Sequence, residues 1–162
     1  MTLNLWAAAA VLAAAFVSGC SDSSTPVAAV PQTAPVYSTS SGSSAREVVN
    51  AIRASANKTG VRRNPTLDSV ARAHAQDMAA RDFFSHTGSN GSNVAQRVKR
   101  AGYRWCFVAE NISKGYTSQN AAIESWRASP GHYRNLVSPK SREFGLANAG
   151  KYWVMVLASK SC

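Results

Sequence analysis

The sequence predicts an α+β domain in which a β-sheet lies between two layers of helices. Residues 152–158 read as a strand that is apolar on both faces. One face carries Tyr152, Val154 and Val156, and the other carries Trp153, Met155 and Leu157. A strand buried on both faces requires helices on both sides of its sheet. Apolar residues at helical spacing between Leu67 and Met78 indicate one of these helices.

Four helices are expected in the folded part of the chain. Asn64 is a suitable N-cap for the second helix, and Pro65 suits its first position. Gly102 ends the third helix, and the fourth ends before Pro130. The expected helices are 47–56, a second one starting at Pro65 with the core-facing stripe Leu67, Val70, Ala71, His74 and Met78, then 93–101 and 119–128.

Three strands are expected between and after these helices. Residues 104–110 are short and rich in aromatic and β-branched side chains, which favours a strand. Strands 143–147 and 152–158 flank the segment Asn148-Ala149-Gly150-Lys151, which is suited to a hairpin turn.

The first 19 residues indicate a secretory signal peptide. The apolar run Leu5–Val17 is shorter than the roughly 20 residues that a membrane-spanning helix needs. It ends in Val17-Ser18-Gly19-Cys20, which resembles a bacterial lipobox and makes Cys20 the expected lipidation site. No Lys or Arg precedes the run, and a buried Ala-rich helix is the alternative. Ser21 after the cysteine favours the outer membrane in a Gram-negative cell.

A tether and one domain are expected after the signal. Residues 20–44 are mostly Ser, Thr, Pro and small apolar residues, so they bury too little apolar surface to fold. The tether would hold the domain, residues 45–162, near a membrane. With Cys20 assigned to the lipid, Cys106 and Cys162 remain, and an exported protein lets them pair as a disulfide. Two unrelated thiols are the alternative.

The chain carries 18 Lys and Arg against 8 Asp and Glu, a net charge of +10. These basic residues are scattered rather than clustered, so a nucleic-acid partner is not expected. An exported protein meets anionic lipids and wall polymers, which favours a diffuse attraction to envelope polyanions. A solvated basic surface without a dedicated partner is equally compatible with the charge.

Three histidines are present, and two follow turn-forming residues. His74 lies on the apolar stripe of the second helix, where a core histidine is expected. His86 and His132 are expected on loops, the second in the sharp turn Ser129-Pro130-Gly131-His132, where histidines more often bind or catalyse. No HExxH or CxxC motif supports a metal site by spacing alone.

Seven short motifs occur in order along residues 45–158. They are Ala73-His74-Ala75-Gln76-Asp77-Met78, Phe83-Phe84-Ser85-His86, Ala101-Gly102-Tyr103, Ala109-Glu110-Asn111-Ile112, Trp126-Arg127-Ala128-Ser129-Pro130-Gly131-His132, Phe144-Gly145-Leu146 and Tyr152-Trp153. Together they resemble the CAP superfamily (SCP-like domain), the grouping of cysteine-rich secretory proteins, venom allergens and plant pathogenesis-related proteins.

The resemblance implies an α-β-α sandwich with a mainly antiparallel central sheet, and a cleft lined by two histidines and acidic residues that binds zinc or another divalent cation in some members. Carried over, the metal ligands are His86 and His132, and the catalytic group would be His86, Glu110 and His132. The implied ligand cleft comprises His86, Glu110, Asn111, Glu124 and His132.

Departures from the family pattern affect the second acid. Ser129 stands where the animal and plant branches carry it, and Glu124 is the nearest acid, either a variant site residue or a solvent-facing one. Asn111 is expected to tie down a turn after Glu110. Arg97 on the third helix either neutralises a nearby carboxylate or faces solvent.

Three function classes follow from these observations. The first is an envelope binding module for a small apolar ligand, a lipid or sterol, or a wall component. The second is a metal-dependent hydrolase of the peptidase type that uses the same cleft. The third is a secreted interaction protein. The missing second acid, and the lack of a nucleophile motif such as GxSxG, favour the first and third over an enzyme.

Overall fold

The structure, a computed structural model, describes residues 44–162. The expected signal peptide 1–19, the lipidation site Cys20 and the tether before Ser44 lie outside the described residues and stay predictions. In the described part, no helix has the length and apolar character needed to cross a membrane.

Residues 44–162 form five helices and four strands. In chain order they are α1 (Ala45–Ser55), β1 (Arg62–Arg63), α2 (Pro65–Arg81), α3 (Val94–Arg100), β2 (Phe107–Lys114), α4 (Gln119–Ala128), α5 (Pro130–Leu136), β3 (Glu143–Ala149) and β4 (Tyr152–Ser159).

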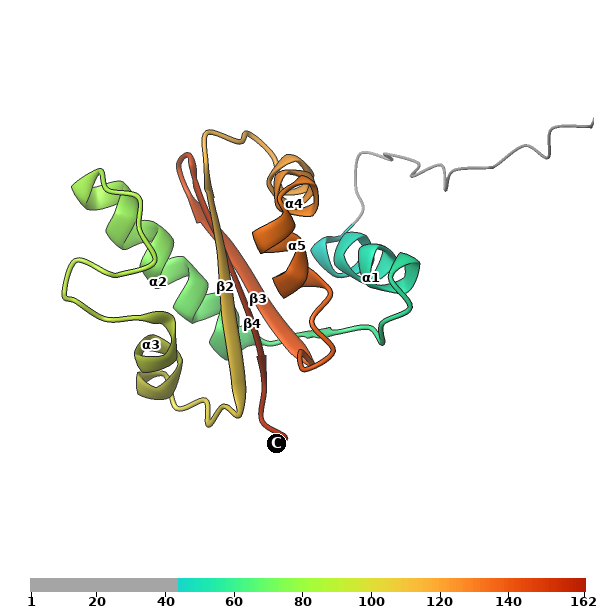
Figure 1. Cartoon of the computed structure of the whole chain (residues 1–162). Coiled ribbons are helices and arrows are strands. Elements are labelled where there is room, and N and C mark those ends of the chain that lie inside the picture. The colour runs from blue at the N-terminus through green and yellow to red at the C-terminus, as the bar shows by residue number, and fades with distance from the viewer. Residues whose placement is uncertain (1–43) are drawn as a thin grey trace, which may run out of the picture. The chain divides into compact units, whose positions relative to one another are not determined.

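The strands form one sheet in the order β1-β3-β4-β2. β4 pairs antiparallel with both β2 and β3, while the two-residue β1 pairs parallel with β3. The sheet is therefore mixed, with the expected antiparallel pairing over nearly all of its length. Figure 1 shows α2 and α3 on one face of this sheet and α1, α4 and α5 on the other. This is the predicted sandwich of helix, sheet and helix.

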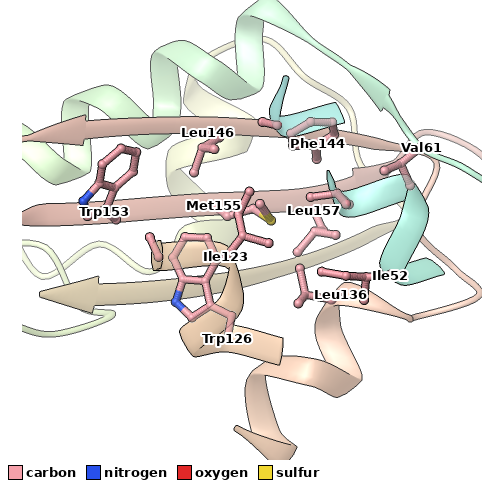
Figure 2. Close-up of a cluster of buried hydrophobic side chains, with 13 residues drawn as sticks. Ile52, Val61, Ile123, Trp126, Leu136, Phe144, Leu146, Trp153, Met155 and Leu157 are labelled. Carbon is pink, nitrogen blue, oxygen red and sulfur yellow. The ribbon is translucent and has the colours of Figure 1, made fainter. Parts of the chain in front are cut away.

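The central strand β4 joins the two halves of the core. Trp153, Met155 and Leu157 pack against residues of α1, α4 and α5, including Trp126 and Ile123 (Figure 2). The opposite face of β4 carries Tyr152, Val154 and Val156, which pack against Leu67, Val70, Ala71 and Met78 of α2. The prediction that this strand is buried on both faces is confirmed.

Local signals in the sequence account for where the helices begin and end. The Asn64 side-chain oxygen accepts hydrogen bonds from the N–H groups of Thr66 and Leu67, so it caps α2 as predicted. Asn93 caps α3 in a capping box with Gln96, and Gly102 has a φ of +78° just after this helix ends.

Two expected local structures are wrong. Residues 130–136 form the helix α5, so His132 lies on a helix and not in a turn. The pair Pro130-Gly131 suggests a turn, but proline is also favoured at the first position of a helix, which is where Pro130 lies.

The strand expected over 104–110 covers 107–114 instead, so Asn111 lies inside β2 and not in a turn. Residues 104 and 105 lie outside the ladder, and Trp105 donates its indole N–H to the Ala95 carbonyl of α3, while Cys106 N still donates to the Ser159 carbonyl of β4. Beyond Glu110 the strand continues because its partner β4 is long enough to pair with it through Lys114.

A disulfide joins Cys106, just before β2, to Cys162 at the end of the described chain. The predicted pairing is confirmed, and the alternative of two unrelated thiols is wrong. The bond fastens the chain beyond β4 to the start of its neighbouring strand.

Candidate functional site

Glu110 is the centre of the polar cluster on the sheet. It lies on β2, and its side chain is only 2% exposed. One carboxylate oxygen, Oε1, is 2.8 Å from His86 Nδ1, and the other, Oε2, accepts a hydrogen bond of 2.8 Å from Arg97 Nη2. Each oxygen of this buried carboxylate therefore has a hydrogen-bond donor from a different element.

Arg97 fixes the position of the carboxylate from α3. Its side chain is 9% exposed, and it also donates to the Ser92 carbonyl (2.6 Å) and to the His86 carbonyl (3.1 Å). Of the two alternatives that the sequence left for Arg97, the neutralised carboxylate is the one found. A buried ion pair with this many hydrogen bonds holds the loop and β2 in one arrangement.

His86 lies on the loop between α2 and α3, as expected, and its side chain is 56% exposed. The buried His74 of α2 holds this loop through a hydrogen bond of 2.9 Å between its Nε2 and the Ser85 carbonyl. A carbonyl oxygen only accepts, so Nε2 carries the proton. Burial is the main cause that lowers the pKa of His74, which favours the neutral ring.

His132 reaches the same region from α5. Its Nδ1 is 3.0 Å from the hydroxyl oxygen of Ser129, the residue that precedes the helix. Burial lowers the pKa of His132, and the charge on His86 lowers it further. The two imidazoles are thus near enough to interact electrostatically, although they are 46 residues apart in the chain.

Hydrogen bonds from two asparagines hold α5 against the sheet. Asn111 of β2 donates to the His132 carbonyl (3.1 Å), and Asn135 donates to the Asn111 side-chain oxygen (2.8 Å). At the other end of α5, the buried Arg53 donates to the Leu136 carbonyl (2.6 Å). These contacts set where His132 lies.

Sequence reasoning missed the roles of Arg53, Asn135 and His74. Arg53 gave one usable signal, since it is a cation next to Ile52 on the buried side of an amphipathic helix. His74 was expected in the core, and it is buried there, but its bond to the Ser85 carbonyl depends on how the loop folds back. No pattern in the sequence marks Asn135.

Glu124 has its recorded side-chain contact outside this cluster. It is on α4, its side chain is 42% exposed, and it forms an ion pair of 2.5 Å with Arg127 Nε. Within residues 44–162 the structure records no hydrogen bond between Glu124 and the two histidines or Glu110. Ser129, which stands where the family's second acid was expected, is instead the partner of His132.

The hydrogen bonds decide which ring nitrogens are open. An ionised carboxylate only accepts, so His86 Nδ1 carries a proton and Nε2 holds the lone pair of the neutral ring. A serine hydroxyl donates or accepts, so His132 can adopt the tautomer that leaves its Nε2 as an acceptor too. Both rings then offer Nε2 to a bound group.

This donor set suits a metal ion only in part. Two neutral imidazoles bind zinc and similar ions, and a carboxylate bonded to the other nitrogen is the usual support for such a ligand. Across the described residues, however, no group of three or more His, Cys, Asp or Glu side chains is placed to hold a metal ion. Because both Glu110 oxygens are engaged, the protein would supply a metal ion with two nitrogen ligands, and water or a ligand would have to fill the remaining positions.

Comparison with known sequences gives one family and two bacterial relatives. The model of the cysteine-rich secretory protein family, CAP, matches residues 46–156. The uncharacterized protein YkwD of Bacillus subtilis is 27% identical over 116 residues, 70% of this chain and 45% of that protein. The uncharacterized membrane protein YlbC of the same organism is 29% identical over 89 residues, 55% of this chain. The chain spans less than half of YkwD and 25% of YlbC.

Solved structures share the fold. An extracellular protein with an SCP domain from Bacillus anthracis has a TM-score of 0.69 at 24% identity, covering 72% of this chain and 39% of that one. An outer surface protein of Borrelia burgdorferi has a TM-score of 0.66 at 18% identity, covering 72% of this chain and 90% of that one. At these identities the likeness concerns the fold alone.

Proposed function

Since this chain belongs to the CAP family of cysteine-rich secretory proteins, we propose that it is an exported, lipid-anchored binding module of the cell envelope. Its ligand would be held at the centre formed by His86 and His132. The observation that carries the proposal is the pair of hydrogen bonds that commits each Nδ1 atom to a protein partner. In each ring the hydrogen bond at Nδ1 fixes the orientation, as in metal sites where histidine binds the ion through Nε2.

Export is supported by three independent features. The disulfide between Cys106 and Cys162 suits an oxidising compartment. The apolar run Leu5–Val17 before Cys20 has the length of the apolar core of a signal peptide. Two proteins of the same fold are described as extracellular and as an outer surface protein. The lipid on Cys20 would leave the domain at the membrane surface.

A divalent transition-metal ion is the ligand for which the two histidines are best suited. Such an ion would supply Lewis acidity and open coordination positions, to which an oxygen of a second ligand binds. Glu110 supports this role as a positioning residue, because it fixes the ring of His86 from a buried position. Phe84, 47% exposed and two residues before His86, offers an apolar contact to the organic part of that ligand.

The hydrolase alternative draws less support from the geometry. In a hydrolase of the peptidase type that uses this cleft, Glu110 would be the carboxylate that takes the proton of the attacking water. Glu110 is 2% exposed, and both its oxygens are bonded to His86 and Arg97. Binding, rather than turnover, is the function that these contacts favour.

Calorimetric titration of the full-length protein with Zn²⁺ and Cu²⁺ tests the proposal. We expect one site of micromolar affinity, lost when His86→Ala and His132→Ala are combined. His74→Gln removes the third histidine but keeps an N–H group for the Ser85 carbonyl that supports the His86 loop, so this matched control should retain binding. Failure of the wild-type protein to bind either ion at micromolar concentration would end the metal proposal.

The anchor is tested separately by metabolic labelling with a radioactive fatty acid. Wild-type protein should incorporate the label and fractionate with membranes, whereas Cys20→Ala should do neither. Label that persists in Cys20→Ala would refute Cys20 as the lipidation site.

A further inference from the structure

A groove lies between α2 and α3, next to the cluster around Glu110, with which it shares Arg97 and His74. Its volume is about 570 Å³, and neither His86 nor His132 lines it. One wall is a single face of α2, and the other is the loop around Ser89 and Asn90 together with α3. Figure 1 shows these two helices on the same side of the sheet, joined by the long segment that carries this loop.

The groove has the size of a small-ligand site. Binding sites for small molecules usually measure about 300–1,000 Å³. Ser69 and Ala73 of α2 and Ala101 after α3 line it with small side chains, which keep it open. Both polar and apolar residues line its walls, as in sites for ligands that have both kinds of surface.

The charge of the groove is positive. Arg81, Arg97 and Arg100 line it, and Asp77 is the one acid among the described residues of its walls. Asp77 accepts hydrogen bonds from Ser89 N (2.8 Å), Ser89 Oγ (2.6 Å) and Arg81 Nε (3.2 Å). Burial acts to raise the pKa of Asp77, but these bonds lower it overall, so the acid stays ionised and engaged.

Two cations at one end of the groove lack a protein partner within the described part of the chain. An adjoining recess of about 310 Å³ shares Arg100 with the groove and adds Lys99. Over residues 44–162, neither Arg100 nor Lys99 forms an ion pair or a side-chain hydrogen bond that the structure records. Both side chains line this recess, which therefore offers two cations to an anionic group of a ligand.

Two buried nitrogens on groove-lining residues also lack hydrogen-bond partners among residues 44–162. They are Nδ1 of His74 and Nε of Arg97. With its proton on Nε2, the neutral His74 ring offers a lone pair at Nδ1, whereas Arg97 Nε offers a proton. Buried polar atoms are normally satisfied, and a hydroxyl group both donates and accepts, so it has the chemistry to serve both atoms.

We infer that this groove binds a small acidic saccharide. The phosphate or carboxylate of the sugar lies at Arg100 and Lys99, and a sugar hydroxyl reaches towards His74 and Arg97. The sugar comes either free or as the headgroup of a glycolipid, and the two sources present the same chemistry.

Titration of the full-length protein with glucose 6-phosphate tests this inference, with inorganic phosphate and glucose as comparison probes at one ionic strength. We expect glucose 6-phosphate to bind at least about tenfold more tightly than either part. Arg100→Ala should weaken binding about tenfold, while Arg72→Ala, which removes an equal charge from the exposed surface of α2 outside the groove, should change it less than about twofold. Equal loss in both variants, or equal affinity for phosphate alone, would refute a built saccharide site.

Blocking the groove gives a second readout. Ala73→Trp places an indole in the groove from an exposed helix position and should abolish binding, while Ala80→Trp on the same helix, outside the groove, should not. Unchanged binding in Ala73→Trp would overturn the inference.

The His86→Ala and His132→Ala double variant should bind the sugar normally, which separates this site from the proposed metal centre. Vesicles with a phosphorylated glycolipid, compared with phosphatidylglycerol vesicles, distinguish the lipid source from the free sugar.

Discussion

Glu110 combines burial, charge and two different partners in one residue. Its carboxylate is 2% exposed and stands between His86 of the loop and Arg97 of α3. Burying a charge is costly unless a counter-charge and hydrogen bonds replace its water. The hydrogen bonds to His86 and Arg97 meet this requirement, and they also leave the carboxylate no free oxygen for another role.

Glu110→Gln tests that assignment through stability. The variant leaves the Arg97 guanidinium buried without its counter-charge, so we expect a loss of about 3 kcal/mol in the free energy of unfolding. The exposed Glu124→Gln is the matched control and should cost less than about 1 kcal/mol. Urea denaturation measures both, and equal losses would show that Glu110 is not a buried structural anion.

His74 makes stability depend on pH. Its pKa in the folded state lies below the usual histidine value of about 6.5, chiefly through burial. Between the two pKa values the unfolded chain binds more protons, so stability is full above about pH 6.5 and falls as the pH drops below it. His132, whose pKa is also lowered, contributes in the same direction.

His74→Gln keeps an N–H group for the Ser85 carbonyl but cannot titrate. We expect it to lose less stability than the wild type between pH 7.5 and pH 5.5, measured by urea denaturation at each pH. The slope that remains belongs to His132 and to other groups. A pH dependence as steep as that of the wild type would mean that His74 does not carry the effect.

Packing of α2 on β3 sets the spacing between one helical layer and the sheet. A Cβ atom at Gly145 would lie 2.1 Å from the Leu67 carbonyl carbon and 2.3 Å from Asp68 N. These are backbone atoms, which cannot move aside as a side chain can. Asp68 also accepts a hydrogen bond of 2.8 Å from Leu146 N, so helix and strand are joined at the same place.

Gly145→Ala should therefore destabilise the fold by at least about 3 kcal/mol, or prevent folding. Gly131→Ala is the matched control, because its Cβ would meet nothing nearer than Arg134 Nη2 at 4.0 Å and it lies in α5. Alanine in a helix is favoured over glycine, so this control should be neutral or stabilising by up to about 1 kcal/mol. Thermal unfolding followed by circular dichroism measures both, and a Gly145→Ala protein as stable as the control would contradict the close approach.

Elements with strong local signals were predictable from the sequence, and α5 was not. For α2, the N-cap Asn64, the proline at position 65 and the helical spacing of the apolar residues after it all indicate the same helix. This helix was therefore expected at the right place. The segment Pro130–Leu136 is too short for a periodic pattern, and its stability depends on tertiary contacts from Asn111 and Arg53. Since such contacts join residues far apart in the chain, no window of sequence displays them.

The candidate site was likewise only partly predictable from the sequence. Residue type and position pointed to His86, Glu110 and His132, with the help of a family resemblance. Three features depend on three-dimensional placement: the engagement of both Glu110 oxygens, the bond between Ser129 and His132, and the ion pair of Glu124 with Arg127. These contacts favour a site that binds a ligand over one that catalyses by acid–base chemistry.

The disulfide acts on the whole domain, because it ties the end of the chain to the start of β2. Cys106 and Cys162 are separated by 56 residues, and a loop of that length corresponds to about 4 kcal/mol of stabilisation in the chain-entropy model. The double variant Cys106→Ser with Cys162→Ser should lose up to this amount in urea denaturation. Cys20→Ser is the control: it removes a cysteine outside the described residues and should leave the unfolding midpoint unchanged. A double variant as stable as the wild type would show that the disulfide adds nothing to the stability of the fold.

The central claim is that a buried carboxylate holds the ring of His86 so that Nε2 is open to a bound group. Long-range ¹H–¹⁵N correlation NMR of the full-length protein near pH 8 reads the tautomer of each histidine ring directly. We expect His86 with its proton on Nδ1 and a lone pair on Nε2, and a loss of this preference in Glu110→Gln. A His86 ring protonated on Nε2 in the wild-type protein would contradict the account.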